Sequence, residues 1–280
     1  MAAQLSYFER KKLLASIFAD TLQQINNSPE WTEAVNISIQ QQQFIPESME
    51  IDMTGCPKHE QPAQIIVSRL RSMEAAAQYK GKRVAVLNFA SSTTPGGGAK
   101  SGASAQEECI CRVSTLYPCL IDQKMKDIFY TPHRKSRNAL HNDDIIYTPN
   151  VVVIKDDDYN MLADTFTVDI ISCAAPNLRE KPNNAYNSGD GKKVEISDEQ
   201  LLVLHEKRAR KIFASAVANG VEVLVLGAFG CGAFCNSPQV VAQAYKNVLP
   251  EFVDYFKVIE FAVYCRSKDL INYEAFKSKM

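Results

Sequence analysis

Two adjacent carboxylates stand near the start of a predicted helix, directly after a glycine-rich loop. These residues are Glu107 and Glu108, and residues 96–98 of the loop are three successive glycines. Glycines leave no side chain between the backbone and a ligand, so amide groups can approach a sugar or phosphate closely. Paired carboxyl groups beside such a loop can supply the acid and base for cleaving a glycosidic bond. The pattern predicts a site that binds and hydrolyses a sugar nucleotide.

The elements around this loop predict where it lies. An apolar run at residues 84–90 precedes it and a helical pattern at residues 109–117 follows it. A strand should therefore lead into the loop and a helix should leave it. In α/β sheets, ligands bind outside the carboxyl ends of strands. The loop is expected at such an end.

A second glycine-rich loop, residues 227–236, follows the predicted strand at residues 221–226. It reads GAFGCGAFCN. Three glycines before a helix are typical of a diphosphate cradle, whereas a tight strand-to-helix connection needs only one. An aromatic side chain in such a loop more often packs into the core. We nevertheless expect one of Phe229 and Phe234 to contact the ligand.

The glycine spacing excludes two common nucleotide loops. The run GGGAKS at residues 96–101 matches neither the P-loop nor the dinucleotide-binding fingerprint. Ser104 and Glu107 also match a capping box, in which Glu107 would only close the helix N-terminus. Adjacent helical residues point about 100° apart, so Glu108 cannot share that role. One carboxylate can stabilise the turn while the other faces the cleft.

Composition restricts the classes of ligand. The 280 residues are 46% hydrophobic and 22% charged, and the formal net charge is -1. This balance is ordinary for a soluble globular protein. A general polyanion binder would carry a basic stripe, so we expect no direct sequence-specific contact with nucleic acid. An anionic ligand should be held locally by the loops.

Eight cysteines and four histidines give no metal signature. Cys231 and Cys235 lie four residues apart, but no second pair has zinc-like spacing. We therefore predict free thiols in a reducing compartment, with no metal and no cofactor. The charged run at residues 9–12 interrupts any signal sequence, and the apolar runs are too short to span a membrane. The expected location is cytoplasmic, or also nuclear in a eukaryote, with no membrane partner.

Residues 81–280 alternate between apolar strands and helical patterns. Strands are expected at residues 83–89, 145–154, 168–174, 221–226 and 258–264. Helices should begin at the capping box of Ser197, ending at Asn219, and again at Ser237. Near-continuous hydrophobic strands with helices on both faces are typical of a layered α/β domain.

Residues 1–80 are predicted to form a helical extension packed on that domain. Ser6 can cap a first helix that ends near residues 28–29, and Pro62 should open a second helix that Gly81 closes. The longest predicted loop, residues 181–193, is either a lid or simply mobile.

Three charged segments are predicted to have structural roles only, and a fourth polar position has two alternative roles. Residues 134–137 and 206–211 are predicted to be solvated charge, and residues 156–158 to form a turn. Asn177 follows a predicted strand and either lines the pocket or forms the turn.

Together these segments resemble the microbial-type poly(ADP-ribose) glycohydrolase family, which is built on a macrodomain. The family signature is a triple glycine followed, after a short spacer, by Gln-Glu-Glu. Here seven residues separate Gly98 from Gln106. Residues 88–90, 174–177 and 227–232 also match the family pattern. The resemblance extends from about residue 80 to the end.

The resemblance implies a three-layer α/β/α macrodomain with a mixed central sheet that binds ADP-ribose in a cleft. It implies that Glu108 is the catalytic acid/base, that Glu107 binds the ribose hydroxyls and that Gln106 holds this segment in place. The other substrate-binding residues that it implies are Asn88, Gly96, Gly97, Gly98, Gly227, Phe229, Gly230, Cys231, Gly232, Ala233 and Phe234. Residues 227–234 would cradle the diphosphate, with Phe234 near the scissile ribose.

The implied reaction is hydrolysis of a ribose–ribose O-glycosidic bond in poly(ADP-ribose), free or on an ADP-ribosylated protein, with ADP-ribose as product. Glu108 would protonate the leaving 2′-oxygen and then deprotonate the attacking water. One residue would serve both steps, unlike the two carboxylates of most glycosidases. A carboxyl group that donates at neutral pH needs a raised pKa, whereas a helix N-terminus lowers it. The sequence does not decide between these effects.

Two alternatives use the same scaffold. One is a mono-ADP-ribosyl hydrolase, and the other is a non-catalytic macrodomain that binds ADP-ribose. A non-catalytic binding protein has no need of two carboxylates beside the glycines.

Overall fold

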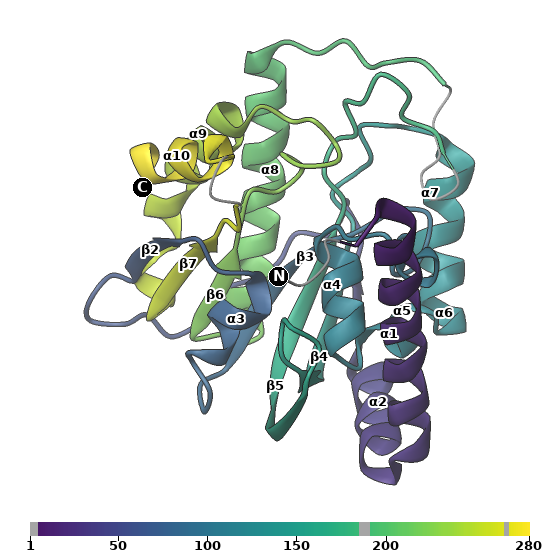
Figure 1. Ribbon diagram of the computed structural model, residues 1–280. Helices are drawn as coiled ribbons and strands as arrows, with labels where there is room; N and C mark the ends of the chain where they lie inside the picture. The colour runs from purple at the N-terminus through teal and green to yellow at the C-terminus, as the bar shows by residue number, and fades with distance from the viewer. Residues whose placement is uncertain (1–4, 185–190, 266–268) are drawn as a thin grey trace.

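The computed structural model describes residues 5–184, 191–265 and 269–280. A seven-stranded sheet occupies its centre, with helices on both faces (Figure 1). The strand order is β1-β4-β5-β3-β6-β7-β2. The β1–β4 and β4–β5 pairs are antiparallel, and the other neighbouring pairs are parallel. The predicted three-layer fold with a mixed sheet is confirmed.

All five predicted strands are present, and two more join them. The strands are β1 (Gln43–Ile45), β2 (Gln64–Ser68), β3 (Val84–Phe89), β4 (Ile145–Lys155), β5 (Met161–Cys173), β6 (Val223–Leu226) and β7 (Val258–Ala262). Strand β5 begins earlier than predicted, because its exposed first half pairs with β4.

Helices of very different length cover the sheet. They are α1 (Tyr7–Asn27), α2 (Pro29–Gln41), α3 (Ser72–Ala77), α4 (Gln106–Val113), α5 (Leu116–Leu120), α6 (Gln123–Met125), α7 (Thr131–Ser136), α8 (Asp198–Ala218), α9 (Pro238–Val248) and α10 (Ile271–Lys279). Short 3-10 turns are η1 (Ala99–Ser101), η3 (Leu249–Glu251) and η4 (Val253–Tyr255), and η2 (Lys126–Tyr130) is a π-helical turn. Among the described residues, no helix combines the length and the apolar character needed to cross a membrane.

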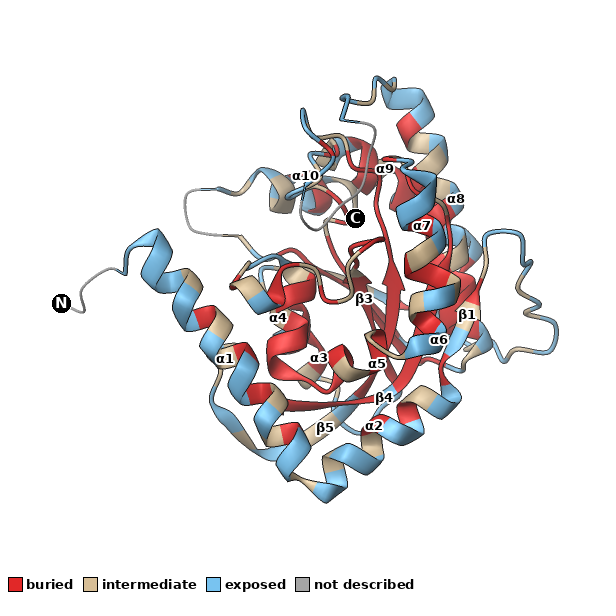
Figure 2. Ribbon diagram, turned by 90° about the vertical axis from the view of Figure 1, so that its right-hand side faces the viewer, coloured by how far each residue is buried: buried red, intermediate tan, exposed pale blue. Residues whose placement is uncertain are grey.

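Alternation along β3 divides its side chains between two cores. Ala85 and Leu87 join the core beneath α8, α9 and α10, whereas Val84 and Val86 join the core beneath α1, α3 and α4. Figure 1 shows these helix groups on opposite sides of the sheet, and Figure 2 shows that α4 is largely buried. Since successive strand residues point to opposite faces, Asn88 points toward α4.

The N-terminal prediction is partly wrong. Ser6 caps α1 through a capping box with Glu9, as expected. The helix predicted from Pro62 is instead strand β2 followed by the short α3. The apolar residues of β2 pair with β7 in parallel register, and this pairing overrides a spacing that also suits a helix.

The segment before residue 81 thus contributes β1 and β2, which form the two edges of the sheet. The boundary near residue 80 therefore divides elements of one continuous sheet, and as a domain boundary it stays a prediction. The predicted starts of α8 at Ser197 and α9 at Ser237 are confirmed.

Candidate active site

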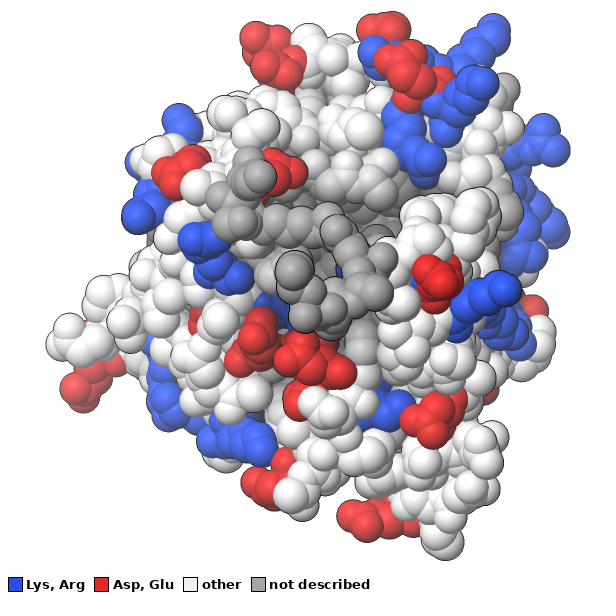
Figure 3. Space-filling view, viewed as in Figure 1, with Lys and Arg blue, Asp and Glu red and all other residues white. Residues whose placement is uncertain are grey.

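Three loops leave the same edge of the sheet. Strands β3, β5 and β6 end at Phe89, Cys173 and Leu226, and β3 runs parallel to both of the others. Their following segments therefore meet at the carboxyl edge, where ligands bind in such sheets. Basic and acidic side chains are both spread over the face seen in Figure 3. An anionic ligand would be recognised by local geometry.

Gln106 connects α4 to two neighbouring elements. Its Oε1 accepts a hydrogen bond from the Phe89 N–H at 2.8 Å. Its Nε2 donates to the Leu87 carbonyl at 2.7 Å and to Ser72 Oγ at 3.0 Å. These bonds fix the start of α4 against the end of β3 and the start of α3. They support the positioning role expected for Gln106.

Glu107 is buried and points into the loop after β3. Its Oε2 accepts a hydrogen bond from the Ser91 N–H at 2.8 Å, and Asn88 Nδ2 lies 3.5 Å from its Oε1. The N-cap of α4 is Ala105, without a side-chain cap bond, so the capping box with Ser104 is wrong. The Glu107 carboxylate accepts its hydrogen bond from the Ser91 N–H, whereas in a capping box it would accept from the backbone N–H of the N-cap residue.

Burial raises the pKa of Glu107 well above its usual range, and the neighbouring Glu108 carboxylate raises it further. Hydrogen bonds from Ser91, Asn88 and Gly96 oppose this rise but do not cancel it. Glu107 therefore keeps its proton to a higher pH than an exposed glutamate.

Glu108 is 7% exposed, and its two carboxylate oxygens differ sharply. Oε1 accepts a hydrogen bond from the Gly98 N–H at 2.9 Å. Oε2 is buried and has no hydrogen-bond partner among the described residues. Buried polar atoms normally have partners, so this oxygen keeps an unused hydrogen-bonding capacity. Asn88 Oδ1 is likewise buried without a partner in the described part of the chain.

Gly96 and Gly97 account for the glycine signature. Their φ angles of 67° and 53° lie in the left-handed region, which residues with a side chain rarely adopt. A Cβ on Gly97 would lie 2.6 Å from Glu108 Oε1 and 3.2 Å from Glu107 Oε2. The loop backbone therefore rests directly against both carboxylates.

Packing explains two of the three glycines in the second loop. A Cβ on Gly227 would lie 2.8 Å from the Ala262 carbonyl oxygen, and one on Gly230 would lie 2.6 Å from Ala175 Cβ. A Cβ on Gly232, by contrast, would meet nothing within 4 Å. Gly232 and Ala233 are exposed, and Cys231 is half-buried. Residues 231–234 of this loop are exposed or half-buried and are therefore open to a ligand.

The two phenylalanines have different surroundings. Phe229 is 1% exposed, and its ring packs against Phe89 and His205, with centroids 5.6 Å and 6.0 Å away. Phe234 is half-buried, with its ring 5.8 Å from that of His141. The Phe229 side chain therefore packs in the core, so only its backbone can contribute to binding. Phe234 is the better candidate for ligand contact.

Sequence reasoning missed a buried polar network under these loops. Arg208, predicted as solvated, is 1% exposed. Its Nε donates to Asp143 Oδ1 at 2.7 Å, and its Nη1 and Nη2 donate to the carbonyls of Ala174 and Leu140. Burial favours a raised pKa for Asp143, but Arg208 and Lys207 outweigh it and hold the pKa below its usual value. The position of Arg208 on the apolar row of α8, four residues before Ile212, was the available signal.

Asn236 joins the second loop to the segment after β5. Its Oδ1 is 2.8 Å from His205 Nε2, and its Nδ2 donates to the carbonyls of Pro176 and Gly230. Asn177 is fully buried and donates to the Pro182 carbonyl, so it forms the turn and does not line the pocket.

The remaining predictions have mixed outcomes. Asp156 Oδ1 accepts from the N–H groups of Asp158 and Asn160, which confirms the turn at residues 156–158. Arg134 of the charged run 134–137 donates to the Thr93 carbonyl in the first loop. No group of three or more potential metal ligands occurs within the described ranges. In the loop at residues 181–193, residues 185–190 lie outside those ranges.

A mixed sheet between two helical layers, with glycine loops at its carboxyl edge, defines a macrodomain-like α/β protein. A family model described as "Microbial-type PARG, catalytic domain" matches residues 18–156. No curated protein matches the chain. The matched residues include the first glycine-rich loop, Glu107 and Glu108, and end before the second loop.

Solved structures extend the similarity to almost the whole chain. The poly(ADP-ribose) glycohydrolase of Thermomonospora curvata is 29% identical, with a TM-score of 0.81, over 96% of this chain and 100% of that chain. That of Deinococcus radiodurans in complex with ADP-ribose is 30% identical, with a TM-score of 0.75, over 88% and 96%. The chain belongs to the microbial-type poly(ADP-ribose) glycohydrolase family.

Proposed function

We propose that this chain hydrolyses the ribose–ribose O-glycosidic bonds of poly(ADP-ribose) and releases ADP-ribose. The observation that carries the proposal is the buried Glu108, with one oxygen fixed by the Gly98 N–H and the other without a partner among the described residues. The related Thermomonospora enzyme has been solved with the inhibitor ADP-HPD, and the Deinococcus enzyme with ADP-ribose. These structures support binding of the same class of ligand here.

Glu108 carries the proton in both halves of the reaction. As the bond between the ribose C1″ and the leaving 2′-oxygen breaks, Glu108 Oε2 gives its proton to that oxygen, and an oxocarbenium-like ribose develops. The resulting carboxylate then takes a proton from water, whose oxygen bonds to C1″. The sum is addition of one water across the glycosidic bond, and Glu108 ends protonated as it began.

Glu107 and the two loops place the substrate for this step. Because its pKa is raised, a protonated Glu107 can donate a hydrogen bond to a ribose hydroxyl. The open backbone at Gly232 and Ala233 is suited to the diphosphate, and Phe234 to the ribose next to it. Helix α1 supports the first loop, because a Cβ on Gly102 would collide with the Lys11 carbonyl.

The location is part of the proposal. All eight cysteines are free thiols. Free thiols are typical of a reducing compartment, which supports the cytoplasm.

Release of ADP-ribose from poly(ADP-ribose) tests the function directly. We expect Glu108→Gln to lower turnover by about 10²- to 10⁴-fold, while the Kd for ADP-ribose changes little. Glu199→Gln is a matched control, because Glu199 is an exposed glutamate in the first turn of α8. This control should behave like the wild type.

The same assay separates the alternatives. Unchanged turnover in Glu108→Gln would exclude Glu108 as the acid/base. Release from mono-ADP-ribosylated protein but not from polymer would indicate a mono-ADP-ribosyl hydrolase. Binding of ADP-ribose without release from either substrate would indicate a non-catalytic binding protein.

A further inference from the structure

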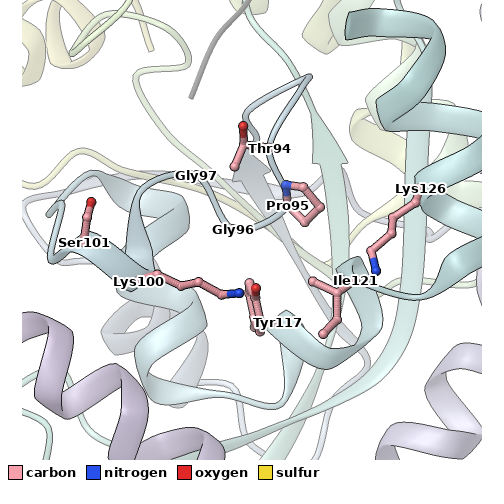
Figure 4. A pocket seen from close by; sticks show the side chains of 9 residues that line it. All are labelled: Thr94, Pro95, Gly96, Gly97, Lys100, Ser101, Tyr117, Ile121 and Lys126. Carbon is pink, nitrogen blue, oxygen red and sulfur yellow. The ribbon is translucent and has the colours of Figure 1, made fainter. Parts of the chain in front are cut away.

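A cavity of about 380 Å³ lies beside the first glycine-rich loop, on the side away from Glu108 (Figure 4). Its walls include Pro95 and Gly96 from the loop after β3 and Tyr117 and Ile121 from the α5 region. Lys100 and Lys126 also line it. The volume is at the lower end of the range for small-molecule sites, so the cavity suits one nucleotide-sized group.

The loop between Pro95 and Gly97 is a wall shared by this cavity and the proposed active site. On one side, Gly97 contacts Glu108 so closely that a Cβ would lie 2.6 Å from its Oε1. On the other side, a Cβ on Gly96 would lie 2.6 Å from Tyr117 Cδ2. A group bound in the cavity therefore lies one backbone thickness from the proposed acid/base.

The chemistry of the walls combines an apolar floor with two cations. Pro95, the Tyr117 ring and Ile121 provide the apolar surface, and Figure 4 shows all three side chains turned toward the cavity. Lys100 Nζ lies 5.6 Å from the centroid of the Tyr117 ring. The planar base of a nucleotide can pack on such a floor while the lysine amines bind the phosphates of the same nucleotide.

The ion pairing of the two lysines decides whether they can bind an anion. Within the part of the chain that the structure describes, neither Lys100 nor Lys126 lies within ion-pair distance of a carboxylate, whereas thirteen other pairs do. Lys126 is also the first residue of the π-helical turn η2. Such turns are rare in proteins overall, and those that occur are often at functional sites.

We propose that this cavity binds the second ADP-ribose unit of the polymer, the unit that carries the leaving 2′-oxygen. Its adenine packs on Pro95, Tyr117 and Ile121, and its diphosphate lies between Lys100 and Lys126. This inference rests on the proposed function and deepens it. The polymer straddles the loop, with the terminal unit at residues 231–234 and the next unit in the cavity.

The subsite has a kinetic consequence. It holds the leaving side of the polymer, so it contributes to binding poly(ADP-ribose) but not to binding free ADP-ribose. A substrate whose leaving group has neither base nor phosphate gains nothing from it. The subsite therefore distinguishes polymer from small ADP-ribosyl compounds.

Steady-state kinetics of the double variant Lys100→Gln/Lys126→Gln tests the proposal. Two substrates are compared: purified poly(ADP-ribose), and ADP-ribose bearing a nitrophenyl group at C1″. We expect the KM for polymer to rise by about tenfold or more, since charge-assisted contacts to a diphosphate are lost. The kcat/KM for the nitrophenyl compound and the Kd for ADP-ribose should stay close to wild type.

The control is Lys124→Gln/Lys135→Gln, which removes the same charge from two exposed lysines outside the cavity. An equal rise in polymer KM in this control would overturn the subsite, because it would show a non-specific effect of charge. An unchanged polymer KM in Lys100→Gln/Lys126→Gln would also overturn it, as would an equal loss on both substrates.

These results are distinguishable from failure of the proposed function. If the wild type releases ADP-ribose from neither substrate, the proposed function fails and the subsite with it. If the wild type cleaves both substrates and the double variant matches it, only the subsite is refuted. Thermal melting of each variant confirms that the compared proteins are folded.

Discussion

Gly97 lies so close to Glu108 that a side chain at this position would displace the Glu108 carboxylate. A Cβ on Gly97 would lie 2.6 Å from Glu108 Oε1. The same oxygen accepts a hydrogen bond from the Gly98 N–H at 2.9 Å. The φ angle of Gly97, 53°, is itself one that side chains rarely adopt. Two independent requirements, steric and conformational, therefore select glycine where the loop meets the proposed acid/base.

Gly97→Ala should abolish most activity by displacing Glu108. A shift of an ångström in a reacting group costs about 100-fold in rate, and we expect a fall in kcat of at least that size. Gly55→Ala is the matched control, since Gly55 also has a positive φ of 79° but a Cβ there meets nothing within 4 Å. Both variants should lose about 1–2 kcal/mol of unfolding free energy.

Only Gly97→Ala should lose turnover, measured as ADP-ribose release from polymer. Equal activity in the two variants would show that contact with Glu108 is not the reason for the glycine.

Gln106→Ala should loosen the start of α4. It removes the bonds to the Phe89 N–H, the Leu87 carbonyl and Ser72 Oγ, and leaves the first two backbone groups without that partner. An unsatisfied buried group costs about 1–3 kcal/mol, so the melting temperature should fall. Because α4 carries Glu108, kcat should fall more than the Kd for ADP-ribose rises.

Gln123→Ala is its control, because Gln123 opens α6 and its side chain, among the described residues, bonds only to the exposed Asp127. A similar loss of kcat in Gln123→Ala would remove the positioning role from Gln106.

The parts of this site that are contiguous in sequence could be predicted, and the parts that are distant could not. Glu108 and Gly98 are ten residues apart, so one motif contains both partners. Arg208 and Asp143 are 65 residues apart, and only the folded sheet brings them together. A charged residue on an apolar helical row indicates burial but does not name its partner.

The same division holds for the fold. The five strands predicted from apolar runs lie next to one another in the sheet and, apart from the first half of β5, are largely buried. The two that were missed, β1 and β2, are short edge strands with mixed exposure. Ile65 and Ile66 belong to a short apolar run that suits either a helix or a strand, and pairing with β7 decided the outcome.

The raised pKa of Glu107 predicts a pH dependence of stability with a definite sign. A group whose pKa is higher in the folded state contributes its full stabilisation of the fold when the pH is below its pKa in the unfolded state, which is 4.5 for this carboxyl. This stabilisation is lost as the pH rises through the pKa of the folded state. Glu107→Gln keeps a neutral side chain of the same shape. Its unfolding free energy relative to wild type should therefore increase as pH rises above about 4.5.

Urea unfolding of both proteins at a series of pH values measures this difference. Glu199→Gln, at an exposed position, should show no such rise. A difference that stays constant for Glu107→Gln would mean that folding does not raise the pKa of Glu107.

Arg208→Met should separate stability from activity. Among the described residues, Lys207, at 2.9 Å, is then the remaining ion-pair partner of Asp143. Breaking a buried pair costs about 3–5 kcal/mol. Arg208→Met/Asp143→Leu removes both charges, and such apolar replacement is often neutral, so unfolding free energy should largely recover. Arg210→Met, which breaks an exposed pair with Glu251, should cost less than about 1 kcal/mol.

Activity should not recover with stability in the double variant. The Arg208 guanidinium also holds the carbonyls of Ala174 and Leu140, which belong to the segments beside the second glycine loop. Without it these segments lose their common anchor, so the KM for polymer should stay high in both Arg208 variants. If the double variant regains wild-type KM together with stability, Arg208 stabilises the fold without positioning the site.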